Sequence, residues 1–504
     1  MPLFQRNYKN RKSSSPQDRS ELLQTTIELG KLVNETDFNE PDVQSPDSIN
    51  AYIYEPECYF SLIHQYAREG DLNSIIDAFN NVNLADRKAI LSAEDYDKLT
   101  PLHHACRYGH IAVAHFLIQQ GADVNARDDD LLTPLHFAAR YNIGSEVGGT
   151  RRKLISYQII GARKLQGAKR CGLQAHEEAE MLRHCDPILF CLISNGARID
   201  AKDKYGLTPL HYAAMKNNIN AAQELVSSGA DVNSIDQNHM APLHTAAAHG
   251  SLSVIKLLAN RGAKIMAVDN RKNTPLHLAA RSGNLKIVKT ILEATVEADR
   301  LKLLKLRNNS EDTVLHLAAD ANCIDVVKFL LESGCDVNET RAMRNTALHS
   351  AASKGYRELV EALLEAGADL TALNKFKETP LHNAAAYNKV EVVKFIIQPD
   401  ILLKAKKILS MFESSGTDRD SYVTLAKGEV LEAPDHRGST PFLVAVSQGH
   451  LDTVKYLLDS VWSNFSSHVK SEFINSPNRY QETPMHIAAA CGFLEICEVK
   501  NDKF

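Results

Sequence analysis

Apolar and small residues recur along this chain at a fixed spacing, and the pattern predicts pairs of short helices. Each unit opens on threonine, proline, leucine and histidine, as at 100–103, and Ala105 follows within the same helix. Threonine is a good helix N-cap and proline is tolerated at the first helical position, so a helix is expected to begin here. A second apolar set follows, such as 287–288 with 291–292, spaced for one face of a second helix.

Glycine or asparagine is expected to end each predicted helix, because both residues tolerate a left-handed backbone. The residue nine positions after each opening is Gly109, Asn142, Asn217, Gly250, Gly283, Asn322, Gly355, Asn388, Gly449 or Gly492. A second glycine lies twelve residues before several openings, at Gly121, Gly196, Gly229, Gly262, Gly334 and Gly367. The repeating unit is therefore helix, tight turn, helix and projecting loop.

The openings define a period. They recur at Thr100, Thr133, Thr208, Thr274, Thr313, Thr346, Thr379, Thr440 and Thr483, with Ala241 in place of one threonine. Successive steps are 33, 75, 33, 33, 39, 33, 33, 61 and 43 residues. A 33-residue period that opens on T-P-L-H-x-A resembles the ankyrin repeat. The resemblance implies an all-α ankyrin-repeat solenoid with projecting finger loops and about ten repeats.

The steps that exceed the period predict insertions. Before the first clear opening, Ser61, His64 and Gly70 hold the offsets of a degenerate repeat, with Ser61 as its cap. The 39-residue step after Thr274 is expected to lengthen one loop around residues 302–309. The predicted division is a tail and linker at 1–57, which can hold a short helix, repeats at 58–142, an insertion at 143–184, repeats at 185–398, an insertion at 399–426, repeats at 427–497 and a tail at 498–504.

Three segments leave alternatives open. Residues 143–184 are basic and aperiodic, and a disordered insertion or retained intronic sequence is favoured over a functional basic loop. The basic residues 1–20 read as a solvated tail, or as a phosphorylation or membrane-surface segment around 13–15. Lys500 and Asn501 stand where the last repeat needs an apolar pair, so the chain is expected to stop within a repeat.

Composition agrees with a cytosolic repeat protein. The 504 residues carry a net charge of -5, which gives no general nucleic-acid footprint. Nine cysteines without a signal peptide indicate reduced thiols. No apolar run is long enough to suggest a membrane span.

The histidines are the obvious candidates for chemistry, since the chain has 20 of them. By resemblance to the ankyrin family, the histidine of each opening binds the threonine hydroxyl and the backbone of a neighbouring loop. The expected repeat-structural residues are Thr100, His103, Thr133, His136, Thr208, His211, His244, Thr274, His277, Thr313, His316, Thr346, His349, Thr379, His382, Thr483 and His486. One histidine per repeat cannot converge on a single metal, so no metal, cofactor or catalytic residue is expected.

The irregular array has a more specific resemblance. A degenerate first repeat, large insertions and the phrases at 100–125 and 133–142 are similar to the cytosolic ankyrin region of TRPA-type cation channels, most of all invertebrate members. That family implies a homotetrameric, nonselective, calcium-permeable channel at the plasma membrane, with the pore outside this chain. Protein partners would bind the concave face and finger loops. The alternative is a complete cytosolic ankyrin scaffold that binds protein partners.

Overall fold

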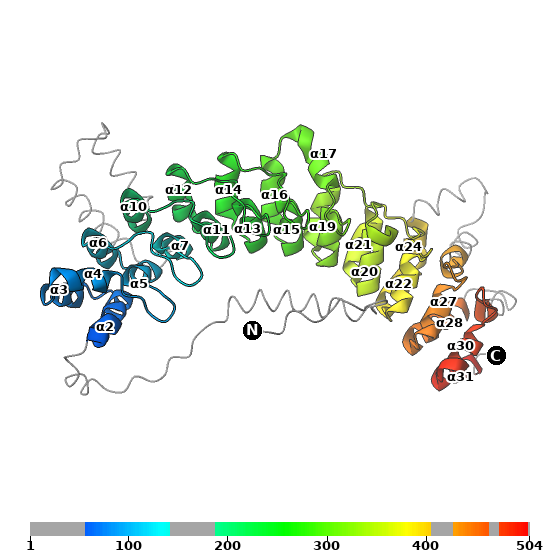
Figure 1. Cartoon of the computed structure of the whole chain (residues 1–504). Coiled ribbons are helices and arrows are strands. Elements are labelled where there is room, and N and C mark those ends of the chain that lie inside the picture. Colours follow the sequence, from blue (N-terminus) through cyan, green and yellow to red (C-terminus); the bar gives the residue numbers. More distant parts are fainter. Residues whose placement is uncertain (1–55, 142–186, 405–426, 463–472, 502–504) are drawn as a thin grey trace. The chain divides into compact units, whose positions relative to one another are not determined.

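The computed structural model describes residues 56–141, 187–404, 427–462 and 473–501 (Figure 1). Within these ranges the regular secondary structure is helical, apart from an isolated β-bridge between Thr340 and Thr346. The repeats belong to one compact unit that begins at Tyr59. Helices are stacked in pairs, and the predicted all-α repeat solenoid is therefore confirmed.

The first helices of the repeats pack against one another in sequence order. They are α2 (Pro56–Glu69), α5 (Pro101–Tyr108), α7 (Pro134–Arg140), α11 (Pro209–Met215), α13 (Pro242–His249), α15 (Pro275–Ser282), α18 (Val314–Asp320), α20 (Ala347–Lys354), α22 (Pro380–Ala386), α27 (Pro441–Ser447) and α30 (Pro484–Cys491). From α5 onward each of these helices contacts the first helix of the next repeat. Proline at the first helical position and the preceding threonine set where most of them begin.

The second helices form the other row of the stack. They are α3 (Leu72–Asn80), α6 (Ile111–Gln119), α10 (Pro187–Ser194), α12 (Ile219–Ser227), α14 (Leu252–Asn260), α16 (Leu285–Ala294), α19 (Ile324–Glu332), α21 (Arg357–Glu365), α23 (Val390–Ile396), α28 (Leu451–Trp462) and α31 (Leu494–Asn501). Although α10 lies far beyond α7 in sequence, it contacts both α7 and α6. It therefore occupies the place of the second helix in the repeat that α7 opens.

Left-handed turns join the two helices of a repeat, as the glycine and asparagine pattern predicts. Gly283 has φ +73°, and a β-carbon there would lie 2.5 Å from the sulfur of Cys323 in the next repeat. Asn217, Asn322 and Asn388 adopt the same region with φ of 52°, 56° and 53°. The turn thus needs both a left-handed backbone and, at Gly283, the absence of a side chain.

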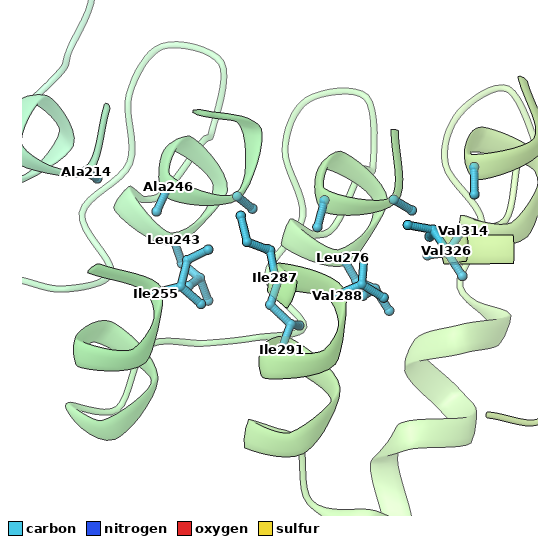
Figure 2. Packing of buried hydrophobic residues seen from close by; sticks show 14 of the residues in the cluster. Ala214, Leu243, Ala246, Ile255, Leu276, Ile287, Val288, Ile291, Val314 and Val326 are labelled. Atoms are coloured by element: carbon cyan, nitrogen blue, oxygen red, sulfur yellow. The ribbon is translucent and has the colours of Figure 1, made fainter. Parts of the chain in front are cut away.

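One continuous hydrophobic core runs through the described repeats. Figure 2 shows how it is layered, with Leu243 of α13 beside Ile255 of α14, and Leu276 of α15 near Val288 of α16. These four side chains are at most 1% exposed. Full burial of such a side chain contributes roughly 1.5–3 kcal/mol. Because each layer contacts only its neighbours, stability is shared along the array rather than held in one centre.

The expectation that six extra residues merely lengthen a loop after Thr274 is wrong. They form part of an additional helix, α17 (Glu297–Lys305), whose Leu303 and Leu304 are buried. The degenerate first repeat has an equivalent helix, α4 (Leu84–Leu91), with Ile90 and Leu91 buried. In both cases an apolar pair lies ten and nine residues before the next opening. Burial of this pair packs the additional helix against the core.

The cap assigned to the first repeat is also wrong. Ser61 lies inside α2, which begins five residues earlier at Pro56, so it cannot be the N-cap. The segment assigned as an insertion at 399–426 begins with a further helix, α24 (Pro399–Lys404), which contacts α21 and α23 and buries Leu402. Residues 1–55 of the predicted tail and linker (1–57), the whole predicted insertion at 143–184, and residues 405–426 of the predicted insertion at 399–426 lie outside the described residues.

Candidate functional site

The threonine and histidine of each opening form a closed local network. The histidine Nδ1 lies 2.8–3.0 Å from the threonine Oγ1 in all eight pairs of this type. The threonine backbone N–H donates to the same nitrogen, at 3.0 Å in Thr100 and Thr379. Because Nδ1 accepts, the proton of the neutral ring belongs on Nε2.

That second nitrogen reaches into the next finger loop. Nε2 of His103 donates to the Leu132 carbonyl at 3.2 Å, and Nε2 of His349 donates to the Glu378 carbonyl at 3.0 Å. The same link joins His136 to Leu207, His211 to Met240, His244 to Asn273 and His382 to Ser439. In the remaining described cases, Nε2 of His277 and of His316 is buried without a hydrogen-bond partner, and His486 is exposed.

Burial makes these rings poor bases. The eight histidines from the opening of Thr100 to that of Thr379 are at most 1% exposed. Burial lowers the pKa to about 4 in His103, His136, His211, His277, His316 and His349. It also lowers the pKa of His244 and His382. A neutral ring that carries its proton on Nε2 and accepts hydrogen bonds at Nδ1 has no free lone pair for a metal or a substrate proton.

Ala241 gives a natural test of the threonine, because it stands at an opening without a hydroxyl. Its backbone N–H still donates to His244 Nδ1 at 3.1 Å, so the ring is already in place. We expect Ala241→Thr to raise the free energy of unfolding by about 1 kcal/mol, and Thr274→Ala to lower it by about as much. Thermal melts and amide exchange of α13 and α15 measure both changes. An Ala241→Thr chain that melts earlier than the parent would contradict this role.

A second repeating polar residue was missed by the sequence analysis. An aspartate or asparagine lies five residues before most openings, and its Oδ1 accepts from the backbone N–H groups two and four residues on, at 2.7–3.0 Å. These residues are Asp95, Asp128, Asp203, Asp236, Asp269, Asn308, Asn374, Asp435 and Asn478. The signal is visible in the sequence as a fixed offset, and it rigidifies each finger loop.

Neighbouring fingers are joined at their tips by backbone hydrogen bonds. We define the fingertip row as the residue three positions before each opening: Asp97, Asp130, Tyr205, Asn238, Arg271, Ser310, Met343, Phe376, Arg437 and Tyr480. The carbonyl of one tip accepts from the residue just before the next tip, as in Lys204 N to Asp130 O at 2.8 Å and Lys375 N to Met343 O at 2.7 Å. The described fingers therefore carry a nearly continuous ladder.

The ladder has one gap, between Ser310 and Ala342, where the described residues show no such bond. In this finger Arg341 stands where the others have aspartate or asparagine. Its guanidinium donates to Asp312 Oδ1 at 3.1 Å, to Asp320 Oδ2 at 2.6 Å and to Ser350 Oγ at 2.8 Å. An ion-pair cluster thus replaces the backbone link at this seam.

The described residues hold no assembled catalytic or metal-binding group. No three histidine, cysteine, aspartate or glutamate side chains gather there as metal ligands would. A hollow of about 500 Å³ beside α17 has only Lys264 and Asp299 as charged lining residues. Burial raises the pKa of Cys191 to about 11 and of Cys335 to about 12, which keeps both as thiols. No helix in the described ranges combines the length and apolarity needed to cross a bilayer.

The sequence of the repeats matches known proteins. A family model described as ankyrin repeats (3 copies) matches residues 63–147, 177–269, 265–341, 339–407 and 417–499. A curated protein, the Transient receptor potential cation channel subfamily A member 1 homolog of Caenorhabditis elegans, is 33% identical over 165 residues. That alignment covers 32% of this chain and 11% of the worm protein, so the chain spans only a small part of its length. On the evidence of its family match and its helix pairs, the chain belongs to the ankyrin-repeat family.

Proposed function

We propose that this chain is the ankyrin region of a TRPA-type, nonselective, calcium-permeable cation channel subunit. The observation that carries the proposal is the segment that is 33% identical to the worm channel homologue. The irregular array supports it, because the inserted helices α4 and α17 depart from a uniform 33-residue stack. In this proposal the pore lies in another part of the subunit, and the repeats serve sensing and assembly.

The same proposal assigns roles to the residues and segments. The threonine–histidine pairs of the openings hold the fold and bind no ligand, so the array is neither catalytic nor metal-dependent. Residues 58–142, 185–398 and 427–497 supply the repeats, while 143–184 interrupts one of them. Partners bind the concave face and the finger loops, and the subunit forms a homotetramer at the inner face of the plasma membrane.

Sequencing the transcript beyond the codon for Phe504 tests this proposal. We expect the reading frame to continue through more repeats into several hydrophobic segments of about 20 residues each. The complete subunit, expressed in cultured cells, should then reach the surface and raise cytosolic calcium on stimulation. A stop codon directly after Phe504, in a transcript from intact tissue, would overturn the channel assignment and leave a cytosolic scaffold.

A further inference from the structure

The tips of the last four described fingers carry a strip of cationic and apolar side chains. We call it the basic fingertip strip, and it consists of Met343, Arg344, Lys375, Phe376, Lys377, Arg437, Arg479 and Tyr480. All eight residues are exposed. Each finger contributes at least one cation, and three of the four contribute an apolar or aromatic side chain. Four of the eight residues belong to the fingertip row, and the other four are their direct neighbours in sequence.

The positive charge of the strip is not neutralised within the described structure. None of its five cations takes part in an ion pair among the described residues. Two nearby acids form hydrogen bonds within their own fingers and no ion pair with the strip. Asn374 Nδ2 donates to Glu378 Oε2 at 2.8 Å, and Asn478 Nδ2 donates to Glu482 Oε2 at 2.8 Å. The strip therefore offers a line of free cations to solvent.

The first fingers show the opposite arrangement. Their tips carry Asp97, Asp129 and Asp130, and two of these acids are paired across fingers. Lys98 lies 2.7 Å from Asp129, and Lys204 lies 3.2 Å from Asp130. A structural need for charge at the tips would favour such pairs everywhere. The cations at 344–479 recur unpaired on four successive fingers, and this recurrence indicates a surface that meets an anion from outside.

Exposed apolar side chains accompany the cations. Met343 is 49% exposed, Phe376 is 42% exposed and Tyr480 is 70% exposed. Lys375 and Lys377 flank Phe376 directly. Single exposed apolar residues are ordinary, but three of them on four successive fingertips, beside free cations, provide the anchors and charges that binding surfaces use.

The finger ladder fixes the spacing of the strip. Backbone bonds join Lys375 to Met343 at 2.7 Å, His436 to Phe376 at 2.8 Å and Arg479 to Arg437 at 2.8 Å. Each finger contributes two hydrogen-bonded segments, so successive tips repeat at about 10 Å. An extended peptide rises about 3.3 Å per residue, so it passes one fingertip every three residues.

We propose that the basic fingertip strip docks an extended acidic peptide of a partner protein, with an acidic and an apolar residue recurring every third position. This deepens the proposed function, since it names the partner chemistry that the array holds. A peptide fits better than a bilayer or a nucleic acid, because those present charge over a broad face and the cations here follow one line. About ten peptide residues span the four tips.

A labelled peptide of about twelve residues that repeats Glu-Phe-Ser provides the probe, with a Gln-Phe-Ser peptide as the neutral match. Fluorescence anisotropy with the whole chain should show binding of the first peptide only, weaker at about 300 mM than at about 50 mM salt. The variant Lys375→Glu, Lys377→Glu, Arg437→Glu should weaken binding at least about tenfold. Phe376→Ala with Tyr480→Ala should weaken it by a smaller factor.

The matched control is Arg271→Glu with Lys272→Glu, which reverses exposed tip charges in the earlier fingers, and it should bind like the parent. Circular dichroism checks that every variant stays folded. Equal loss in the control and strip variants, or no binding of the acidic peptide, would overturn the proposal. Strip-dependent binding only to vesicles of phosphatidylcholine and phosphatidylserine would overturn it in favour of a membrane. Peptide binding together with a stop codon after Phe504 would support the strip and reject only the channel.

Discussion

Acidification from about pH 7 to about pH 5 is expected to unfold much of the repeat array. Six opening histidines have a pKa near 4 in the folded chain, because burial lowers it from 6.5. The unfolded chain therefore binds more protons below pH 6.5, and folding loses stability as the pH falls. The stability that the buried neutral rings contribute is fully present above pH 6.5, declines between pH 6.5 and about pH 4, and is absent below about pH 4.

The size of this effect follows from the shifts. One pKa unit corresponds to 1.36 kcal/mol, so each ring costs on the order of 2 kcal/mol at about pH 5. Asp128, Asp200 and Asp236 oppose the trend, since burial raises the pKa of each carboxyl, that of Asp128 to about 6, and their protonation favours the folded state. Six histidines outweigh these three groups, and the net change is large against a typical stability of about 5–15 kcal/mol.

Thermal melts followed by circular dichroism across this pH range measure the effect. A single His349→Gln variant should lose stability at neutral pH, because it disturbs the bond to the Glu378 carbonyl, yet depend less on pH. The matched control is His436→Gln at an exposed fingertip, where the ring Nδ1 lies 3.1 Å from the Phe376 carbonyl oxygen, and this variant should keep the parent's loss of stability on acidification. A melting temperature that stays flat between about pH 7 and about pH 5 would show that the buried rings do not control acid stability.

Replacing Arg341 with methionine is expected to destabilise the middle of the array by about 2–4 kcal/mol. The Arg341 side chain is 22% exposed, and its partners Asp312 and Asp320 are 12% and 26% exposed. Removing the guanidinium leaves two half-desolvated carboxylates and the Ser350 hydroxyl without their donor. Lys354 Nζ lies 3.3 Å from Asp320 Oδ1, so it still pairs with the Asp320 carboxylate. The Asp312 carboxylate has no such second cation among the described residues.

Amide exchange of α18 and α20 should accelerate in this variant, and denaturant melts should report the loss. Arg341→Lys is expected to recover less than half, because an ammonium cannot reach two carboxylates and a hydroxyl in a fixed fork. Arg344→Met is the matched control, since Arg344 is exposed three residues away and forms no ion pair among the described residues. If both methionine variants behave like the parent, the cluster adds nothing to stability.

Much of the fold could be read from the sequence because it depends on short-range offsets. The cap at Thr100, the left-handed turn at Gly283 and the apolar faces of both helices repeat within one unit. The additional helices α4 and α17 were not predicted, and the extra residues after Thr274 were expected only to lengthen a loop. The pairs Ile90–Leu91 and Leu303–Leu304 are the sequence signal for these helices. In the steps of 33 residues, the positions ten and nine before the opening hold only one apolar residue.

The candidate surfaces were harder to predict than the helices. The aspartate and asparagine row, from Asp95 to Asn478, is a fixed offset and was available in the sequence. The partners of Arg341 were not, because Asp312 and Asp320 belong to the preceding repeat and only packing brings them together. Likewise, the sequence does not show that the cations of the basic fingertip strip lack ion pairs. This becomes apparent only in comparison with the first fingers, where Lys98 and Lys204 pair with aspartates of neighbouring fingers.

The gap in the finger ladder has a mechanical consequence. Elsewhere, main-chain bonds tie each tip to the next, and such bonds respond to neither salt nor pH in the ordinary range. Between Ser310 and Ala342, the fingers are joined instead through the guanidinium of Arg341 and through Arg307, which contacts Glu339 and the Thr340 carbonyl. The stiffness of the array at this seam therefore depends on ionic strength more strongly than it does where main-chain bonds join the tips.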